Sequence, residues 1–111
     1  MTAFRLRKDG YVYIVKSTDG LYKVGGTGDF VQRVKQLSKN GIKLEIKVII
    51  KSKYHMYLEK FLHLHLSKYR EYNEWYRCNN IVNIVLSFVK KHGSVFEVKE
   101  IKKFNESIEY F

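Results

Sequence analysis

A small set of polar side chains has the types and the spacing that phosphodiester hydrolysis requires: Tyr13, Lys23, Arg33, Glu59 and His63. The reaction needs a base for the attacking water, positive charge beside the non-bridging oxygens, and stabilisation of the leaving oxygen. A tyrosine next to a lysine, an arginine, and a carboxylate with a divalent metal can each supply one of these functions. We therefore interpret the set as a candidate catalytic site for phosphodiester cleavage.

The first two members lie in a predicted β-hairpin. Tyr13 is in the alternating run Tyr11–Lys16, Lys23 is in the run Leu21–Gly25, and Thr18-Asp19-Gly20 between them is typical of a tight turn. Residues of paired strands can lie opposite one another, and an ammonium group beside a phenol favours the phenolate, which can act as a base. The alternative is that these tyrosines are ordinary strand residues and that Lys23 is a solvated charge.

Arg33 lies in a predicted helix. Asp29 at the N-cap with Gln32 at position N3 forms a capping-box pattern, and Asn40-Gly41 is expected to end the helix. An apolar stripe recurs at helical spacing at Phe30, Val34 and Leu37. Arg33 lies at the rim of this stripe, where its guanidinium can reach the hairpin and donate two hydrogen bonds to a phosphate. The alternative is a surface arginine.

Glu59 and His63 are spaced i, i+4 in the predicted helix Tyr54–Tyr69 and share one side of it. Its apolar face is predicted to contain Leu58, Phe61, Leu62, His65 and Tyr69. A carboxylate can hold one Mg²⁺ whose other ligands are water and phosphate, and a histidine can orient a phosphate or relay a proton. A zinc pair of His63 and His65 is rejected because residues i and i+2 point to different sides of a helix. We expect His65 to be a core histidine.

The remaining segments complete an α+β domain with a small antiparallel three-stranded sheet flanked by helices. We expect the chain to leave regular structure at Gly25-Gly26-Thr27-Gly28. Further elements are predicted in chain order: a strand at Leu44–Ile50, a loop at Glu71–Tyr76, a helix at Ile81–Lys91 ending at His92-Gly93, an edge strand at Val95–Ile101, and a tail at Asn105–Phe111. Trp75 is interpreted as a core anchor, and a nucleic-acid stacking role is the alternative.

Composition restricts the class of protein. The 111 residues predict a single domain over residues 1–111, and the formal net charge of +10 favours a polyanionic partner, with nucleic acid first and an acidic membrane surface second. A bias toward lysine that serves only solubility is the alternative. Cys78 is the only cysteine, which excludes a disulfide framework and fits an intracellular compartment. We expect no signal peptide and no membrane span.

In their order along the chain, these residues resemble the GIY-YIG endonuclease superfamily, and in particular its small phage- and virus-type branch. Tyr11-Val12-Tyr13 is similar to the first motif, with tyrosine in place of its glycine, and Tyr22-Lys23-Val24-Gly25 is similar to the YKIG form of the second. Arg33 matches the arginine of the first helix, and Glu74-Trp75-Tyr76 resembles the closing EWF. The resemblance covers Gly10–Tyr76, and the helix and tail at residues 81–111 follow it.

The resemblance implies a metal-dependent endonuclease that hydrolyses DNA phosphodiester bonds with Mg²⁺ or Mn²⁺. Tyr13 would activate water, Arg33 would stabilise the developing charge, and Glu59 would bind the metal. Many members carry His or Tyr four residues after the arginine, where this chain has Leu37, so His63 would supply that function. The implied catalytic set is Tyr13, Lys23, Arg33, Glu59 and His63.

DNA is the expected partner, with RNA not excluded, and Arg33, Lys35 and Tyr11 are expected to contact it. One active site cuts one strand, so the sequence is compatible with a monomer or a homodimer. The alternative function is a nucleic-acid-binding module that has this fold and no catalytic activity.

Overall fold

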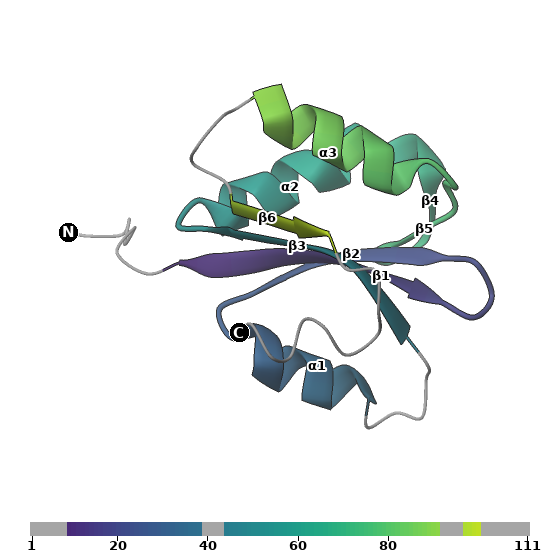
Figure 1. Cartoon of the computed structure of the whole chain (residues 1–111). Coiled ribbons are helices and arrows are strands. Elements are labelled where there is room, and N and C mark those ends of the chain that lie inside the picture. The colour runs from purple at the N-terminus through teal and green to yellow at the C-terminus, as the bar shows by residue number, and fades with distance from the viewer. Residues whose placement is uncertain (1–8, 39–43, 92–96, 101–111) are drawn as a thin grey trace.

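The computed structural model describes residues 9–38, 44–91 and 97–100 as an α+β fold around one antiparallel sheet (Figure 1). The elements are β1 (Gly10–Ser17), β2 (Tyr22–Thr27), α1 (Phe30–Ser38), β3 (Leu44–Ser52), α2 (His55–His65), the 3₁₀ turn η1 (Ser67–Tyr69), β4 (Arg70–Tyr72), β5 (Trp75–Tyr76), α3 (Ile81–Lys91) and β6 (Glu97–Glu100). The strand order is β4-β5-β2-β1-β3-β6. The predicted α+β class is confirmed.

The predicted number of strands is wrong. The three central strands β2, β1 and β3 are those expected from the sequence, but β4 and β5 extend the sheet at one edge and β6 extends it at the other. The predicted loop Glu71–Tyr76 is therefore largely a second, short hairpin. The predicted edge strand at Val95–Ile101 is confirmed where β6 is described. The predicted tail and the ends of helices at Asn40-Gly41 and His92-Gly93 lie outside the described residues.

The strand β2 also continues through the two glycines at which we expected it to break. Tyr13 pairs with Gly25 and Val12 pairs with Gly26 in the register between β1 and β2. The hairpin turn is closed by a hydrogen bond of 3.1 Å from the Gly20 amide to the Ser17 carbonyl, and Gly20 has a φ of +86°, which favours glycine. The predicted hairpin is thus confirmed, with a longer second strand.

Helix α1 begins as its sequence predicts. The Asp29 carboxylate accepts a hydrogen bond of 3.1 Å from the Gln32 amide, which satisfies one of the amides left unpaired at the helix N-terminus. This cap fixes the start of the helix, and Arg33 follows one turn later, with its amide bonded to the Asp29 carbonyl at 3.1 Å. The side chains of Val34 and Leu37 lie outside the described residues.

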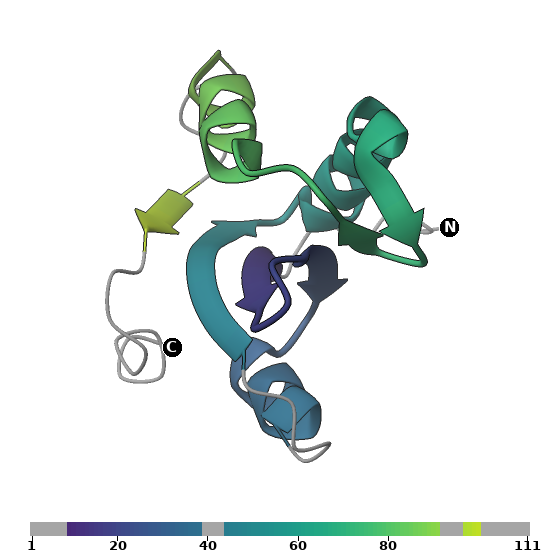
Figure 2. The ribbon, with the colours of Figure 1, turned by 90° about the vertical axis from the view of Figure 1, so that its right-hand side faces the viewer.

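The two faces of the sheet carry separate hydrophobic clusters (Figures 1 and 2). Alternation along β1 sends Val12 and Ile14 toward α2 and α3, and sends Tyr13 and Val15 toward α1. Helices α2 and α3 cover the first face, and α1 covers the second (Figure 1). Side chains of neighbouring β1 residues therefore reach opposite layers.

Three expectations about the core are wrong. Phe61 and His65 are both exposed and stack with each other at a centroid distance of 6.1 Å, because α2 turns its leucines at positions 58 and 62 toward the sheet instead. Trp75 is only half-buried, whereas its neighbour Tyr76 is fully buried. The helix predicted to reach Tyr69 ends at His65, and the separate 3₁₀ turn η1 follows it.

None of the helices in the described segments combines the length and the apolar character that crossing a lipid bilayer requires.

Candidate active site

Tyr13 and Arg33 form one half of a polar cluster. The Tyr13 ring is 1% exposed and packs near Phe30, with ring centroids 6.0 Å apart. The Nε–H of Arg33 donates to Tyr13 Oη at 3.1 Å, and Nη1 donates to Gln36 Oε1 at 3.2 Å. The hydrogen bond to Tyr13 and the electrostatic interaction with Tyr13 raise the pKa of Arg33, so the guanidinium remains cationic.

Glu59, His63 and Glu74 form the other half. Glu59 and His63 are one turn apart on α2, and Glu74 lies in the turn between β4 and β5. One ligand atom from each of the three lies within 4.8 Å of the others. The Nε2 atom of His63 is 2.8 Å from the Val24 carbonyl oxygen and 3.9 Å from Glu59 Oε2. The three side chains are half-buried, which is the exposure expected where a substrate must enter.

The donor atoms of this half fit a hard divalent cation. A carbonyl oxygen only accepts hydrogen bonds, so the contact with Val24 requires the proton of His63 to be on Nε2. Glu59 and Glu74 then remain as the two oxygen donors, and Mg²⁺ is commonly held by one or two carboxylates with water and phosphate. His63 is placed to donate a hydrogen bond rather than to coordinate the metal through Nε2.

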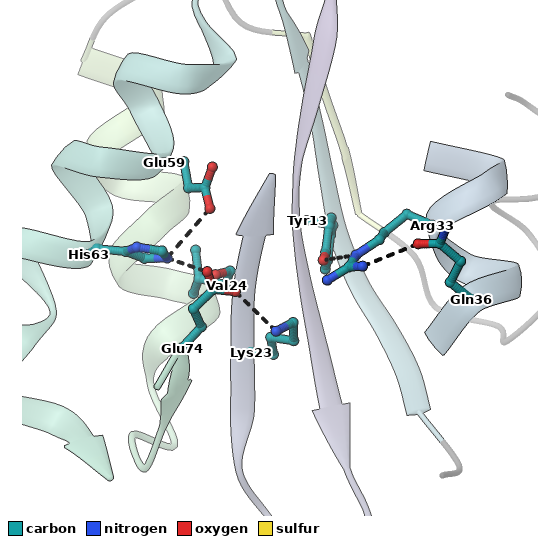
Figure 3. A network of polar contacts seen from close by, with 8 residues as sticks. All are labelled: Tyr13, Lys23, Val24, Arg33, Gln36, Glu59, His63 and Glu74. Carbon is teal, nitrogen blue, oxygen red and sulfur yellow. Dashed lines mark hydrogen bonds and ion pairs between the residues drawn. The ribbon is translucent and has the colours of Figure 1, made fainter. Parts of the chain in front are cut away.

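Adjacent glycines of β2 bring the two halves together. A Cβ atom on Gly25 would overlap the Tyr13 hydroxyl, and a Cβ atom on Gly26 would overlap the Glu59 carboxylate. The strand β5 pairs only with Tyr22 and Lys23, so this part of β2 extends beyond β5 at the edge of the sheet. Figure 3 shows Glu59 and Glu74 on one side of β2 and Tyr13 with Arg33 on the other. The carboxylates of Glu74 and Glu59 also raise the pKa of Arg33, so the halves interact electrostatically.

Comparison with known proteins assigns this chain to a family. A family model for the T5orf172 domain matches residues 10–107. The chain belongs to the T5orf172 domain family. This domain occurs in phage proteins and in other proteins related to nucleases. No curated protein and no solved structure matches the chain.

In this T5orf172 domain, Lys23 is not the direct neighbour of Tyr13 that the sequence suggested. Lys23 pairs with Val15 across the hairpin, while Tyr13 pairs with Gly25. The Lys23 ammonium instead forms an ion pair of 3.0 Å with Glu74 and lies 5.6 Å from the Trp75 ring centroid. Lys23 thus positions one of the two carboxylates of the candidate metal site.

The two other expected nucleic-acid contacts lie in different places. Tyr11 is half-buried next to the Tyr13 half of the cluster, because its ring centroid lies 6.2 Å from that of Phe30, the ring that Tyr13 also contacts. Lys35 is exposed on α1, two residues after Arg33, so its side chain leaves the helix in a different direction. The structure therefore places Arg33, but not Lys35, at the polar cluster.

Sequence reasoning did not assign a role to Glu74 or Gln36. Glu74 lies next to the motif-like residues Trp75 and Tyr76, so its position in that motif was the signal that could have identified it. Burial raises the pKa of Tyr76, whose hydroxyl has no hydrogen-bond partner within the described residues. Tyr76 is therefore disfavoured as a base.

Alanine substitutions at the two glycines are expected to have different effects, one on metal affinity and the other on the stability of the fold. Gly26→Ala is expected to weaken Mn²⁺ binding with little loss of stability, because the added methyl displaces the flexible end of Glu59. Gly25→Ala is expected to destabilise the fold by about 1–3 kcal/mol, because the methyl overlaps the buried Tyr13 ring. Thermal unfolding and calorimetric Mn²⁺ titration of both variants measure the effects. Unchanged Mn²⁺ affinity in Gly26→Ala would contradict this arrangement.

Proposed function

We propose that this T5orf172 domain is a GIY-YIG-type endonuclease that hydrolyses DNA phosphodiester bonds with Mg²⁺ or Mn²⁺. The observation that carries the proposal is the meeting of two half-sites at the glycine edge of β2. One half offers a phenol and a guanidinium, and the other offers two carboxylates within reach of one cation. These groups match the three requirements of phosphodiester hydrolysis.

The mechanism begins with Arg33. In the absence of substrate its guanidinium covers the buried Tyr13 hydroxyl. A phosphate is a stronger partner for arginine than a phenol, because it offers two charged acceptors to the planar fork. Binding of the scissile phosphate therefore draws the guanidinium from the Tyr13 hydroxyl toward the non-bridging oxygens, which opens the phenol oxygen to water.

Tyr13 then takes a proton from the attacking water as the water oxygen bonds to phosphorus, and the leaving oxygen departs in line on the opposite side. A metal ion held by Glu59 and Glu74 would neutralise phosphate charge and stabilise the leaving oxygen. Lys23 holds Glu74, and His63 fixes the β2 edge at Val24. The net charge of +10 retains the polyanionic strand. An intracellular site of action fits this substrate.

Incubation of purified protein with supercoiled plasmid tests the proposal. We expect nicked circles with Mg²⁺ or Mn²⁺ and none with EDTA, because the carboxylate pair has no catalytic partner without metal. Absence of cleavage of plasmid, single-stranded DNA, duplex DNA and RNA in both metals would overturn it. Salt-sensitive binding without turnover would instead support a binding module, with a log–log slope of about −0.9 per duplex phosphate contacted.

A further inference from the structure

The β4–β5 hairpin carries a row of side chains on the face that α1 also covers. Tyr72 pairs with Trp75, and Trp75 pairs with Lys23. Directly opposite residues of neighbouring antiparallel strands point to the same face. Lys23 in turn pairs with Val15, which belongs to the same cluster as Tyr13. The row therefore leads along one face of the sheet toward the Tyr13 half of the candidate site.

The two aromatic members of this row are accessible. Tyr72 is 53% exposed, and Trp75 is half-buried. Lys23 lies 5.6 Å from the centroid of the Trp75 ring and is itself at the candidate site through its ion pair with Glu74. A ring that met only structural needs would be buried, as Tyr76 is on the opposite face. The outer ring of the row is instead presented to solvent.

The charges around the row suit a polyanion. Glu71 is paired with Arg77 at 3.1 Å, and Glu74 is paired with Lys23 at 3.0 Å. Both acidic residues of the hairpin are thus neutralised by a cation. A negatively charged strand therefore meets no uncompensated carboxylate as it crosses the hairpin.

We propose that Tyr72 and Trp75 form a stacking platform for an unpaired base of single-stranded DNA whose backbone continues to Arg33. Aromatic side chains beside basic groups bind single strands by stacking, whereas both faces of a base inside a duplex are covered by its neighbours. The substrate class is therefore DNA with an unpaired segment beside the cut. This inference rests on the proposed function for the identity of the strand, but the binding itself requires no cleavage.

The fluorescence of Trp75 tests the platform directly, because Trp75 is the single tryptophan of the chain. The full chain is titrated with oligothymidine in EDTA, which prevents metal-dependent cleavage. We expect strong quenching of Trp75 by oligothymidine and weak quenching by a blunt duplex of equal length. Tyr72→Leu is expected to weaken oligothymidine binding about tenfold, and Tyr72→Phe is expected to retain it, since the ring supplies the stacking.

Tyr57→Leu is the matched control, because Tyr57 is a 59% exposed tyrosine on α2, the helix that covers the other face. Trp75 is left unchanged as the reporter. Absence of oligothymidine binding, binding without a change in Trp75 fluorescence, equal quenching by the blunt duplex, or equal losses for Tyr72→Leu and Tyr57→Leu would each overturn the platform. Quenching by oligothymidine in a protein that cuts nothing with metal would support the platform and refute the nuclease.

Discussion

Glu59→Gln is expected to slow metal-dependent DNA cleavage by on the order of 10²–10³-fold or more, while the protein remains folded. The substitution keeps the shape of the side chain but removes the charge, and Glu59 is one of only two carboxylates in the candidate metal cluster. The side chain is 25% exposed, so the amide can be solvated without a large loss of stability. Plasmid nicking at saturating Mg²⁺ measures the rate, and calorimetry with Mn²⁺ measures the affinity.

Glu45→Gln serves as the control for Glu59→Gln. Glu45 lies on β3, and its side chain is 53% exposed and paired with Lys47. Its loss changes the net charge of the protein by the same amount but leaves the candidate metal site intact. If both variants nick plasmid at the wild-type rate, Glu59 has no catalytic role. If both variants are slowed equally, the slower cleavage results from the change in net charge and not from the loss of a metal ligand.

Tyr13→Phe is expected to lower kcat for DNA cleavage by about 10²–10⁴-fold, the range typical of a lost general base. The phenylalanine keeps the ring packed near Phe30 and removes only the oxygen that accepts from Arg33. Substrate affinity should change little, because the freed guanidinium remains available to phosphate. Single-turnover cleavage measured at several DNA concentrations separates the rate of the chemical step from the substrate affinity.

The matched control is Tyr22→Phe, since Tyr22 is a buried strand tyrosine that belongs to the cluster on the opposite face. A rate near that of the wild type for Tyr13→Phe would remove the proposed base from the mechanism. A loss of the same size in Tyr22→Phe would show that the rate reports packing of the sheet rather than chemistry at one hydroxyl.

Strong local patterns in the sequence predicted the elements that carry these residues. Alternation at Tyr11–Lys16 and the turn at Gly20 predicted the hairpin, and the N-cap at Asp29 predicted the start of α1. The position of Arg33 on its helix also predicted that its guanidinium would reach the hairpin, where it bonds to Tyr13. In each case a periodicity or a cap acts within a few residues, so it can be read without knowledge of the tertiary fold.

The parts that escaped prediction depend on contacts between distant segments. The strands β4 and β5 have three and two residues, which is too short for a period to show, and their turn is marked only by Asn73 with a φ of 48°. Gly25 and Gly26 are extended because they pair with β1, and a side chain at either position would overlap Tyr13 or Glu59. Neither Tyr13 nor Glu59 is near these glycines in the sequence, so the local pattern of β2 could not reveal the contact. Glu74 joins the cluster only once β5 has paired with β2.

The order in which the half-sites occur along the chain has a consequence during synthesis. A chain emerging from a ribosome exposes Tyr13 and Arg33 first, and Glu74 becomes available only after α2 and all of β4 have been made. In the folded protein the carboxylate of Glu59 and the phenol of Tyr13 approach neighbouring glycines of β2 from opposite faces. A chain that ends before Glu74 therefore has the phenol, the guanidinium and one carboxylate, but not the carboxylate pair. The carboxylate pair is therefore complete only in a chain that has been made at least as far as Glu74.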